Sequence, residues 1–522
     1  MAGIIEQDFT HWCKPVPLND DYPDKFDLKC ITSIEELNTI LNSYKKEDGT
    51  YPMMGFDTET TGLDVFNDRL LGLSFSWKET EGYYIPVNET NKNELLSTLK
   101  PIFENPNTKK IGQNMKFDLM VLAVNGIALK GELCDCMIAH YLLQPELKHG
   151  MDYLAEVYLG YQTIHYEDLV GGKGKKQLTL QEVPLEKVCD YAAEDADFTY
   201  QLWEKFNPKI KDSEETQKLF AMEMNLLPVL AEMEITGIHL NSAALEQYNI
   251  ELTRGIEDAE QEIYKEAGHE FNIASPKQLQ TVLFEERKLK PGKKTKTGYS
   301  TDTSVLEELA MYDVIPKMIL EYREMAKLQS TYVETLPKLC DANGRIHTDF
   351  VQTGTATGRL SCREPNLQNI PVRNEAGRRI RSAFTAPDGK VLISADYAQI
   401  ELVVLAHLSG DKNMCKAFTE GTDVHRSTAA LIYGVQPEAV TPEMRRTAKT
   451  INFGVIYGMS AFRLAQDLGI RRMEAEQFIQ NYDKFYSDIS RFKAESVHPK
   501  HCASSTTSMY GIAGHSGGHL LR

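Results

Sequence analysis

The chain has 522 residues, 42% of them hydrophobic and 25% charged, which is typical of a globular protein and sufficient for roughly three or four domains. Its net charge of −18 excludes a uniformly basic nucleic-acid-binding surface, so phosphate contacts have to come from local basic patches. No run of about 18 apolar residues and no signal-like amino terminus is present, which predicts a cytoplasmic protein without a membrane partner.

The first 206 residues have the pattern of an α/β domain behind a short leader. Residues 1–50 are polar and proline-interrupted, and we interpret them as a leader or edge segment. Apolar runs separated by a helical stretch then predict strands. The first run ends in Asp57-Thr-Glu59, and strand alternation places both carboxylates on the same side of the chain. The predicted strands are Met53–Phe56, Leu70–Trp77, Tyr83–Val87 and Ile111–Asn114.

Two further carboxylates follow in the same part of the chain. Asp118 lies at the start of a helix that follows a strand, and Tyr191 and Asp195 stand four apart on a helix predicted from Leu185 to Phe206. Oxygen ligands suit Mg²⁺ or Mn²⁺, and two such ions held by shared carboxylates can activate water and neutralise the leaving oxygen in phosphodiester cleavage. Taken by itself, each such residue is more often a helix cap or a solvated side chain.

The middle of the chain has helical periodicity. A polar linker is expected at 207–217, followed by helices over Leu219–Ile235 and Ser242–Ala267 and a helix start at Ser275-Pro276. A turn then carries several lysines, either as an ordinary solvated loop or as a tip that grips phosphates without reading bases. These lysines include Lys290, Lys293, Lys294 and Lys296.

The next segment combines amides, one arginine and one carboxylate. Arg359, Asn366 and Gln368 suit the minor-groove acceptors that all base pairs share, so they can test pairing shape without reading sequence. Val391–Ala395 is predicted as an apolar strand that ends in Asp396, a candidate metal ligand.

A helix is predicted between the cap Thr441 and the stop Gly458. Two cations and then two rings recur every four residues along it and form one ridge. Such a ridge suits a ligand with phosphate at one end and a flat base at the other, as in a nucleoside triphosphate. An amphipathic helix with an aromatic core stripe is the alternative interpretation. The ridge consists of Arg445, Lys449, Phe453 and Tyr457.

The order DTET, NxxFD and YxxxD resembles the 3′→5′ exonuclease domains of the DEDD superfamily, in the subclass whose last motif carries a tyrosine. This resemblance implies a ribonuclease H-like mixed sheet with helices. It also implies that Tyr191 lies beside the attacking water. The implied metal ligands are Asp57, Glu59, Asp118 and Asp195.

From about residue 50 to 490 the blocks together resemble family A DNA polymerases. The implied fold is an incomplete right-hand polymerase, with helical thumb and fingers and a partial α+β palm. Asp396 would bind both metals and Glu401 would exclude a ribose 2′-hydroxyl. His425, Arg445 and Lys449 would bind the triphosphate, with Lys449 also catalytic. Phe453 would pack on the sugar and base, Tyr457 would lie near the templating base, and the lysine-rich turn would be the thumb tip.

Three departures accompany the resemblance. Val403 stands where motif A usually has arginine. We expect no 5′ nuclease ahead of the exonuclease, and we expect impaired polymerisation because motif C is not found in this sequence. After residue 496 the periodicity is lost, and we interpret the ending as aberrant, with a zinc site as the alternative. No CxxC pair is present among the nine cysteines, which predicts neither a disulfide scaffold nor an evident zinc site elsewhere. The candidate tail ligands are His498, His501, Cys502, His515 and His519.

The sequence therefore predicts a monomeric DNA-dependent DNA polymerase with 3′→5′ proofreading, using Mg²⁺ or Mn²⁺, primer-template DNA, single-stranded 3′ ends and dNTPs. An exonuclease without polymerase activity, and a primer-template-binding protein without turnover, are the alternatives. The expected segments are a leader (1–50), exonuclease (51–206), linker (207–217), thumb (218–345), partial palm (346–408), fingers (409–490) and tail (491–522).

Overall fold

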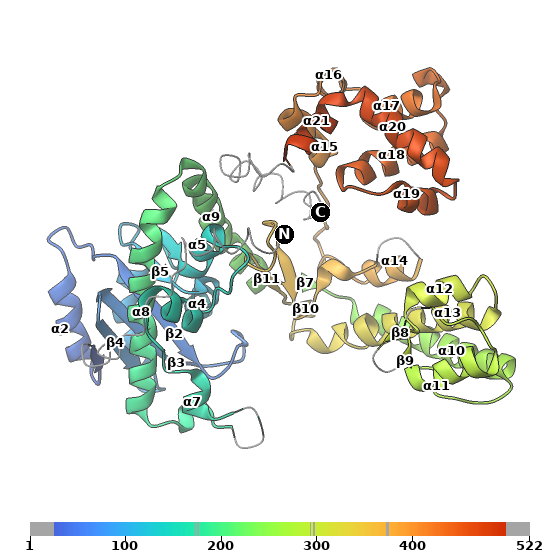
Figure 1. The fold of residues 1–522 in the computed structure, drawn as a ribbon. Helices are drawn as coiled ribbons and strands as arrows, with labels where there is room; N and C mark the ends of the chain where they lie inside the picture. Colours follow the sequence, from blue (N-terminus) through green and yellow to red (C-terminus); the bar gives the residue numbers. More distant parts are fainter. Residues whose placement is uncertain are drawn as a thin grey trace. The chain divides into compact units, whose positions relative to one another are not determined.

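A computed structural model describes residues 26–172, 174, 177–292, 294–295, 298–371 and 375–496 (Figure 1). The chain divides into two compact units. The first contains the described residues of Met1–Glu232, Val351–Ser361 and Ala395–Arg522, and the second contains those of Met233–Phe350 and Cys362–Ser394. In the described part of the chain, no helix is both long and apolar enough to cross a membrane.

A six-stranded mixed sheet organises the amino-terminal part of the first unit, with strand order β1-β4-β3-β2-β5-β6. The central strand β2 pairs antiparallel with β3 and parallel with β5. This sheet confirms the predicted α/β exonuclease-type fold. The strands are β1 (Asp27–Cys30), β2 (Met54–Thr60), β3 (Leu70–Lys78), β4 (Glu81–Pro86), β5 (Lys110–Gly112) and β6 (Leu133–Asp135).

The long helix α8 (Leu185–Lys211) packs against the sheet and contacts β1, β2, β3 and β4 (Figure 1). Its inward residues Ala192, Ala193 and Ala196 are fully buried. Glycines on the strands permit this close approach, because a Cβ atom on Gly55 would lie 2.7 Å from the carbonyl oxygen of Ala196. Small residues on both surfaces thus bring α8 down onto β2.

Two sequence-based expectations for this region need correction. Residues 1–50 were expected to be a leader or edge segment. Within them, β1 does lie on the edge of the sheet beside β4, but β1 and helix α2 (Ile34–Tyr44) belong to the folded domain and do not form a leader. The expected linker at 207–217 is mostly helical, because α8 continues to Lys211 and α9 (Glu214–Thr236) begins three residues later. Burial of Phe206 and Ile210, which stand four apart, holds the last turns of α8 in place.

The second unit is largely helical, as predicted for a thumb-like region. Its long helix α10 (Ser242–Ala267) packs on α13 (Val314–Leu328), and α12 (Thr303–Leu309) packs on α13. Near the lysine-rich turn, β8 (Lys294–Thr295) and β9 (Gly298–Tyr299) form a short antiparallel hairpin.

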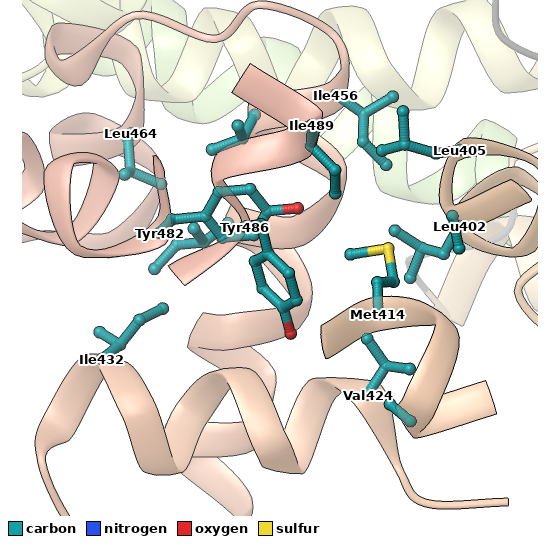
Figure 2. Packing of buried hydrophobic residues seen from close by; sticks show 14 of the residues in the cluster. Leu402, Leu405, Met414, Val424, Ile432, Ile456, Leu464, Tyr482, Tyr486 and Ile489 are labelled. Carbon is teal, nitrogen blue, oxygen red and sulfur yellow. The ribbon is translucent and has the colours of Figure 1, made fainter. Parts of the chain in front are cut away.

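Helices α15–α21, from Ile400 to Ser496, surround a shared hydrophobic core, and a smaller buried cluster lies between α17 and α18. Tyr482 and Tyr486 are buried, and their side chains lie between Ile432 on α17 (Val424–Tyr433) and Met414 on α16 (Lys412–Thr419) (Figure 2). The remaining helices are α15 (Ile400–Ser409), α18 (Pro442–Ile456), α19 (Ala461–Leu468), α20 (Arg472–Phe485) and α21 (Ser487–Ser496).

The prediction of a strand at Val391–Ala395 was also wrong. This segment has no regular secondary structure, and the side chains of Val391 and Ile393 are 80% and 86% exposed. A strand requires a hydrogen-bonded neighbour, and none of the described strands pairs with these residues. The apolar pattern is therefore present without the pairing that would make it a strand.

Candidate active sites

Three carboxylates converge where β2 meets α8. Asp57 and Glu59 lie two apart on β2, and Asp195 comes from α8. One carboxylate oxygen from each of the three lies within 4.8 Å of the others. This is the only such group of three potential metal ligands among the described residues. Strand alternation and the close approach of α8 together bring these side chains to one point.

Asp118 lies beside this group without belonging to it. It stands in the first turn of α4 (Met115–Val124), and its side chain is buried. The hydroxyl and backbone N–H of Thr58 donate to Oδ1 of Asp118 at 2.6 and 3.0 Å. The structure thus connects Asp118 to the strand between Asp57 and Glu59.

Tyr191 lies one helical turn before Asp195 on α8, as its spacing predicts. The Asp195 carboxylate, together with burial, raises the pKa of the Tyr191 hydroxyl, which is also close to Glu59 and Asp57. This hydroxyl therefore stays protonated and remains a hydrogen-bond donor at the edge of the carboxylate group.

Burial disfavours the charged form of every carboxylate in the site. It raises the pKa of Asp57 well above its usual range, and burial together with the neighbouring Asp57 charge raises that of Glu59. Burial followed by nearby carboxylates also raises the pKa values of Asp118 and Asp195.

The donor set fits a divalent cation. Oε1 of Glu59 is buried and has no hydrogen-bond partner, which is costly for a carboxylate oxygen unless a cation binds there. Asp57, Glu59 and Asp195 would hold such an ion through oxygen ligands, which hard cations prefer.

The ridge predicted for the helix after Thr441 forms on α18. The Thr441 hydroxyl accepts a hydrogen bond from the Met444 N–H, and Gly458 has a left-handed backbone with φ of 69°, which confirms both predicted ends. Lys449 is exposed, whereas Nε of Arg445 donates to Asp423 at 2.6 Å. The two cations and then the two rings follow the predicted order along the helix.

His425 is buried against this helix. Its ring packs on Phe453 with the centroids 5.7 Å apart, and its Nδ1 lies 2.9 Å from the Asn452 side-chain amide. Burial lowers the pKa of His425, so the ring is neutral at physiological pH. The structure therefore joins His425 to the ridge, although it comes from α17.

Glu401, Arg359 and Tyr457 meet at the lower end of the ridge. Arg359 Nη2 lies 3.4 Å from Oε1 of Glu401. Burial and the nearby Glu401 carboxylate raise the pKa of Tyr457 to about 12. Three residues predicted separately are thereby in one cluster.

Other predicted residues are not brought into such clusters. Asp396 is exposed and belongs to none of the groups of potential ligands found among the described residues. Asn366 and Gln368 are exposed, with the Asn366 side chain accepting from the Gln368 N–H. Lys290 and Lys294 are exposed. The positions outside the described residues are Lys293, Lys296 and the tail residues His498, His501, Cys502, His515 and His519.

Sequence reasoning missed two contacts near the carboxylate site, the bonds from Thr58 to Asp118 and the bond from the start of α4 to Asp135. Asp135 follows a buried strand and precedes an apolar helix, which is the usual position of a helix cap. Its role as the cap of α5 (Cys136–Leu143) was therefore predictable from the sequence. Its second contact, with residues 114 and 115, depends on the fold and leaves no signal in the sequence.

Comparisons with known proteins match two parts of the chain. The profile of a 3′-5′ exonuclease domain matches residues 28–211, which include the whole carboxylate site. The chain belongs to DNA polymerase family A, whose profile matches residues 242–513 and so runs into the segment expected to be an aberrant tail.

Individual relatives support the same family. DNA polymerase I of Treponema pallidum is 42% identical over 505 residues, covering 88% of this chain and 50% of the relative, and that of Pseudomonas aeruginosa is 44% identical over 452 residues, covering 84% and 49%. The chain spans about half the length of these relatives. The POL domain of Pol1 from M. smegmatis, solved with DNA primer-template and dNTP, is similar with a TM-score of 0.75 and 30% identity over 93% of this chain and 84% of that structure.

Proposed function

We propose that the chain removes nucleotides from DNA 3′ ends at the Asp57–Glu59–Asp195 site and belongs to a DNA-directed DNA polymerase that uses this activity for proofreading. The carboxylate convergence within 4.8 Å carries the proposal. Mg²⁺ or Mn²⁺, two ions per site, would activate a water and stabilise the leaving oxygen of the terminal phosphodiester. Asp118 contributes as a further ligand or through Thr58, and the Tyr191 hydroxyl orients the attacking water.

The α18 ridge supports the polymerase part of the proposal. Arg445 and Lys449 bind the triphosphate with His425, and Phe453 and Tyr457 pack on the nucleoside. Glu401 excludes a 2′-hydroxyl, and Asp396 is a metal ligand for nucleotidyl transfer, in which Lys449 also acts. Arg359, Asn366, Gln368 and the exposed lysines of the thumb-like unit contact primer-template DNA.

The decisive experiment measures degradation of a labelled single strand and of a labelled primer-template, each with Mg²⁺. Asp57→Asn and Asp195→Asn should each reduce degradation by orders of magnitude, because loss of one ligand displaces the metals and the attacking water. Glu186→Gln is the matched control, since Glu186 is an exposed carboxylate on the same helix α8. Equal degradation by Asp195→Asn and Glu186→Gln would contradict the site.

Adding dNTPs to the same primer-template reports polymerisation. Extension in an Asp57→Asn background, where degradation cannot hide synthesis, supports the polymerase. Degradation without extension is expected both from the exonuclease alternative and from a family A chain without motif C, so it supports the exonuclease activity alone. Binding without either activity favours a DNA-binding protein.

A further inference from the structure

Asp135 connects the starts of two helices, α4 and α5. It is the last residue of β6 and has 1% of its surface exposed. Its Oδ1 accepts from the backbone N–H groups of Met137 and Ile138 at 2.7 and 3.1 Å, which caps helix α5 (Cys136–Leu143). Its Oδ2 accepts from the Met115 N–H at 2.7 Å, at the start of α4.

Helix α4 depends on this distant carboxylate. Its own N-cap residue, Asn114, has a left-handed backbone and makes no side-chain capping bond. The first backbone donor of α4 is therefore satisfied from 20 residues further along the chain. The Asn114 N–H also points to Asp135, at 3.4 Å from Oδ1.

The first turn of α4 carries Asp118. From there, the two bonds to Thr58 lead onto β2 between Asp57 and Glu59. Hydrogen bonds at both ends of this helix start thus connect Asp135, through the first turn of α4, to the carboxylate site.

We propose that Asp135 is a positioning residue for the metal site: by holding the start of α4, it sets the position of Asp118 against β2. The proposal rests on the proposed exonuclease function. Asp135 touches neither substrate nor the reacting atoms, and it acts only through Asp118.

Asp135→Asn separates its two roles. Asparagine caps helices about as well as aspartate, so its carbonyl oxygen can keep the α5 cap. Its NH₂ group then faces the Met115 N–H, donor against donor, and the α4 contact is lost. Ser33→Ala is the matched control, because Ser33 caps α2 in the same domain through the Glu36 N–H at 3.1 Å.

The test measures amide hydrogen exchange, Mn²⁺ affinity by electron paramagnetic resonance, and degradation kinetics on a single strand. In Asp135→Asn, we expect faster exchange at Met115–Asp118, unchanged exchange at Met137 and Ile138, and Mn²⁺ affinity weaker by roughly 10-fold or more. We also expect kcat to fall with little change in KM. Ser33→Ala should lower the Tm and leave Mn²⁺ affinity unchanged.

Faster exchange at Met115 with unchanged Mn²⁺ affinity would overturn the proposal, as would an equal loss of affinity in Ser33→Ala. Asp57→Asn tests the proposed function separately. Unaltered Mn²⁺ binding in that variant would show that the proposed metal site does not exist at Asp57. If Asp135→Asn does not fold, Asp135→Ser tests the same point, since serine can cap α5 but is too short to reach Met115.

Discussion

Thr58 directs both of its donors at one oxygen of Asp118. The hydroxyl lies 2.6 Å and the backbone nitrogen 3.0 Å from Oδ1, and the pair is buried. The backbone bond depends only on the fold, whereas the hydroxyl bond depends on the side chain. Thr58 therefore offers a way to move Asp118 without removing a carboxylate.

Thr58→Val should slow the exonuclease by about 10-fold or more through displacement of Asp118, because outer-shell partners of metal ligands affect activity on this scale. Valine keeps the shape of threonine, so the domain should fold with a loss of about 1–3 kcal/mol from the missing buried hydrogen bond. Single-turnover degradation and urea unfolding measure the two effects.

The control is Thr39→Val on α2, where the hydroxyl donates only to the exposed Glu35 carbonyl. Degradation at the same rate by both variants would show that the Thr58 hydroxyl does not position Asp118.

The neutral His140 should make the exonuclease domain sensitive to acid. His140 is fully buried, with Nδ1 2.7 Å from Nδ1 of His149 and Nε2 3.0 Å from the Tyr158 hydroxyl. Burial, followed by the charges of His149 and Lys209, lowers the pKa of His140 to about 3. Below pH 6.5 the unfolded chain binds a proton that the folded chain excludes, so stability falls as the pH falls from 6.5 towards 3.

At pH 5 the free energy of unfolding should therefore be about 2 kcal/mol lower than at pH 7.5 from this residue, at about 1.36 kcal/mol for each pH unit below 6.5. Tryptophan fluorescence in urea reports on the domain, since Trp77 and Trp203 are buried in it. His140→Phe should lose this part of the pH dependence. His269→Asn, which changes an exposed histidine, should retain it, and an unchanged acid slope in His140→Phe would contradict the prediction.

Local patterns predicted how the side chains align within each element of the carboxylate site, whereas the meeting of Asp195 with Asp57 and Glu59 was expected only from the family resemblance. A two-residue spacing on a strand aligned Asp57 with Glu59, and a four-residue spacing on a helix aligned Tyr191 with Asp195. Both spacings lie within one element, so periodicity alone determines the geometry. The sequence likewise predicted the ends of α18, because Thr441 and Gly458 act locally.

Contacts between distant segments were not predictable in the same way. Residues 391–395 have the apolar pattern of a strand. Whether they form one depends on a neighbouring strand to pair with, and the segment's own sequence does not show this. Asp135 and Met115 stand 20 residues apart and meet only because β5 and β6 are adjacent. The polar stretch after Phe206 suggested a linker, yet the single buried side chain of Ile210 extends the helix.

Asp423→Asn should strengthen dNTP binding. Oδ2 of Asp423 lies 2.6 Å from Nε of Arg445. The Asp423 carboxylate therefore competes with a triphosphate for the Arg445 guanidinium. It also caps α17 through the N–H groups of His425 and Arg426, and asparagine preserves that cap. Removing one negative charge should raise dNTP affinity by several-fold at low salt, with a smaller gain at high salt.

Equilibrium binding of a fluorescent dNTP analogue measures this effect. Arg445→Ala should weaken binding in both backgrounds. The exposed pair Arg472–Glu476 supplies the control, because Glu476→Gln removes a similar charge from α20. Weaker binding in Asp423→Asn would show that Asp423 organises the triphosphate site instead of competing for it.

Gly55→Ala should disable the exonuclease by lifting α8 from β2. A Cβ atom at this position would lie 2.7 Å from the Ala196 carbonyl oxygen and 3.2 Å from the Tyr200 backbone nitrogen. Both contacts involve the helix backbone, which cannot rotate away as a side chain can, so α8 has to shift and carry Asp195 away from Asp57 and Glu59. A displacement of about 1 Å in a catalytic group can cost roughly 100-fold in rate.

The matched control is Gly150→Ala, because its added Cβ meets no atom within 4 Å and its φ of −72° suits alanine. We expect Gly55→Ala to lose stability, Mn²⁺ affinity and degradation together, while Gly150→Ala retains all three. Full activity in a folded Gly55→Ala protein would show that the position of Asp195 does not depend on the contact between α8 and β2.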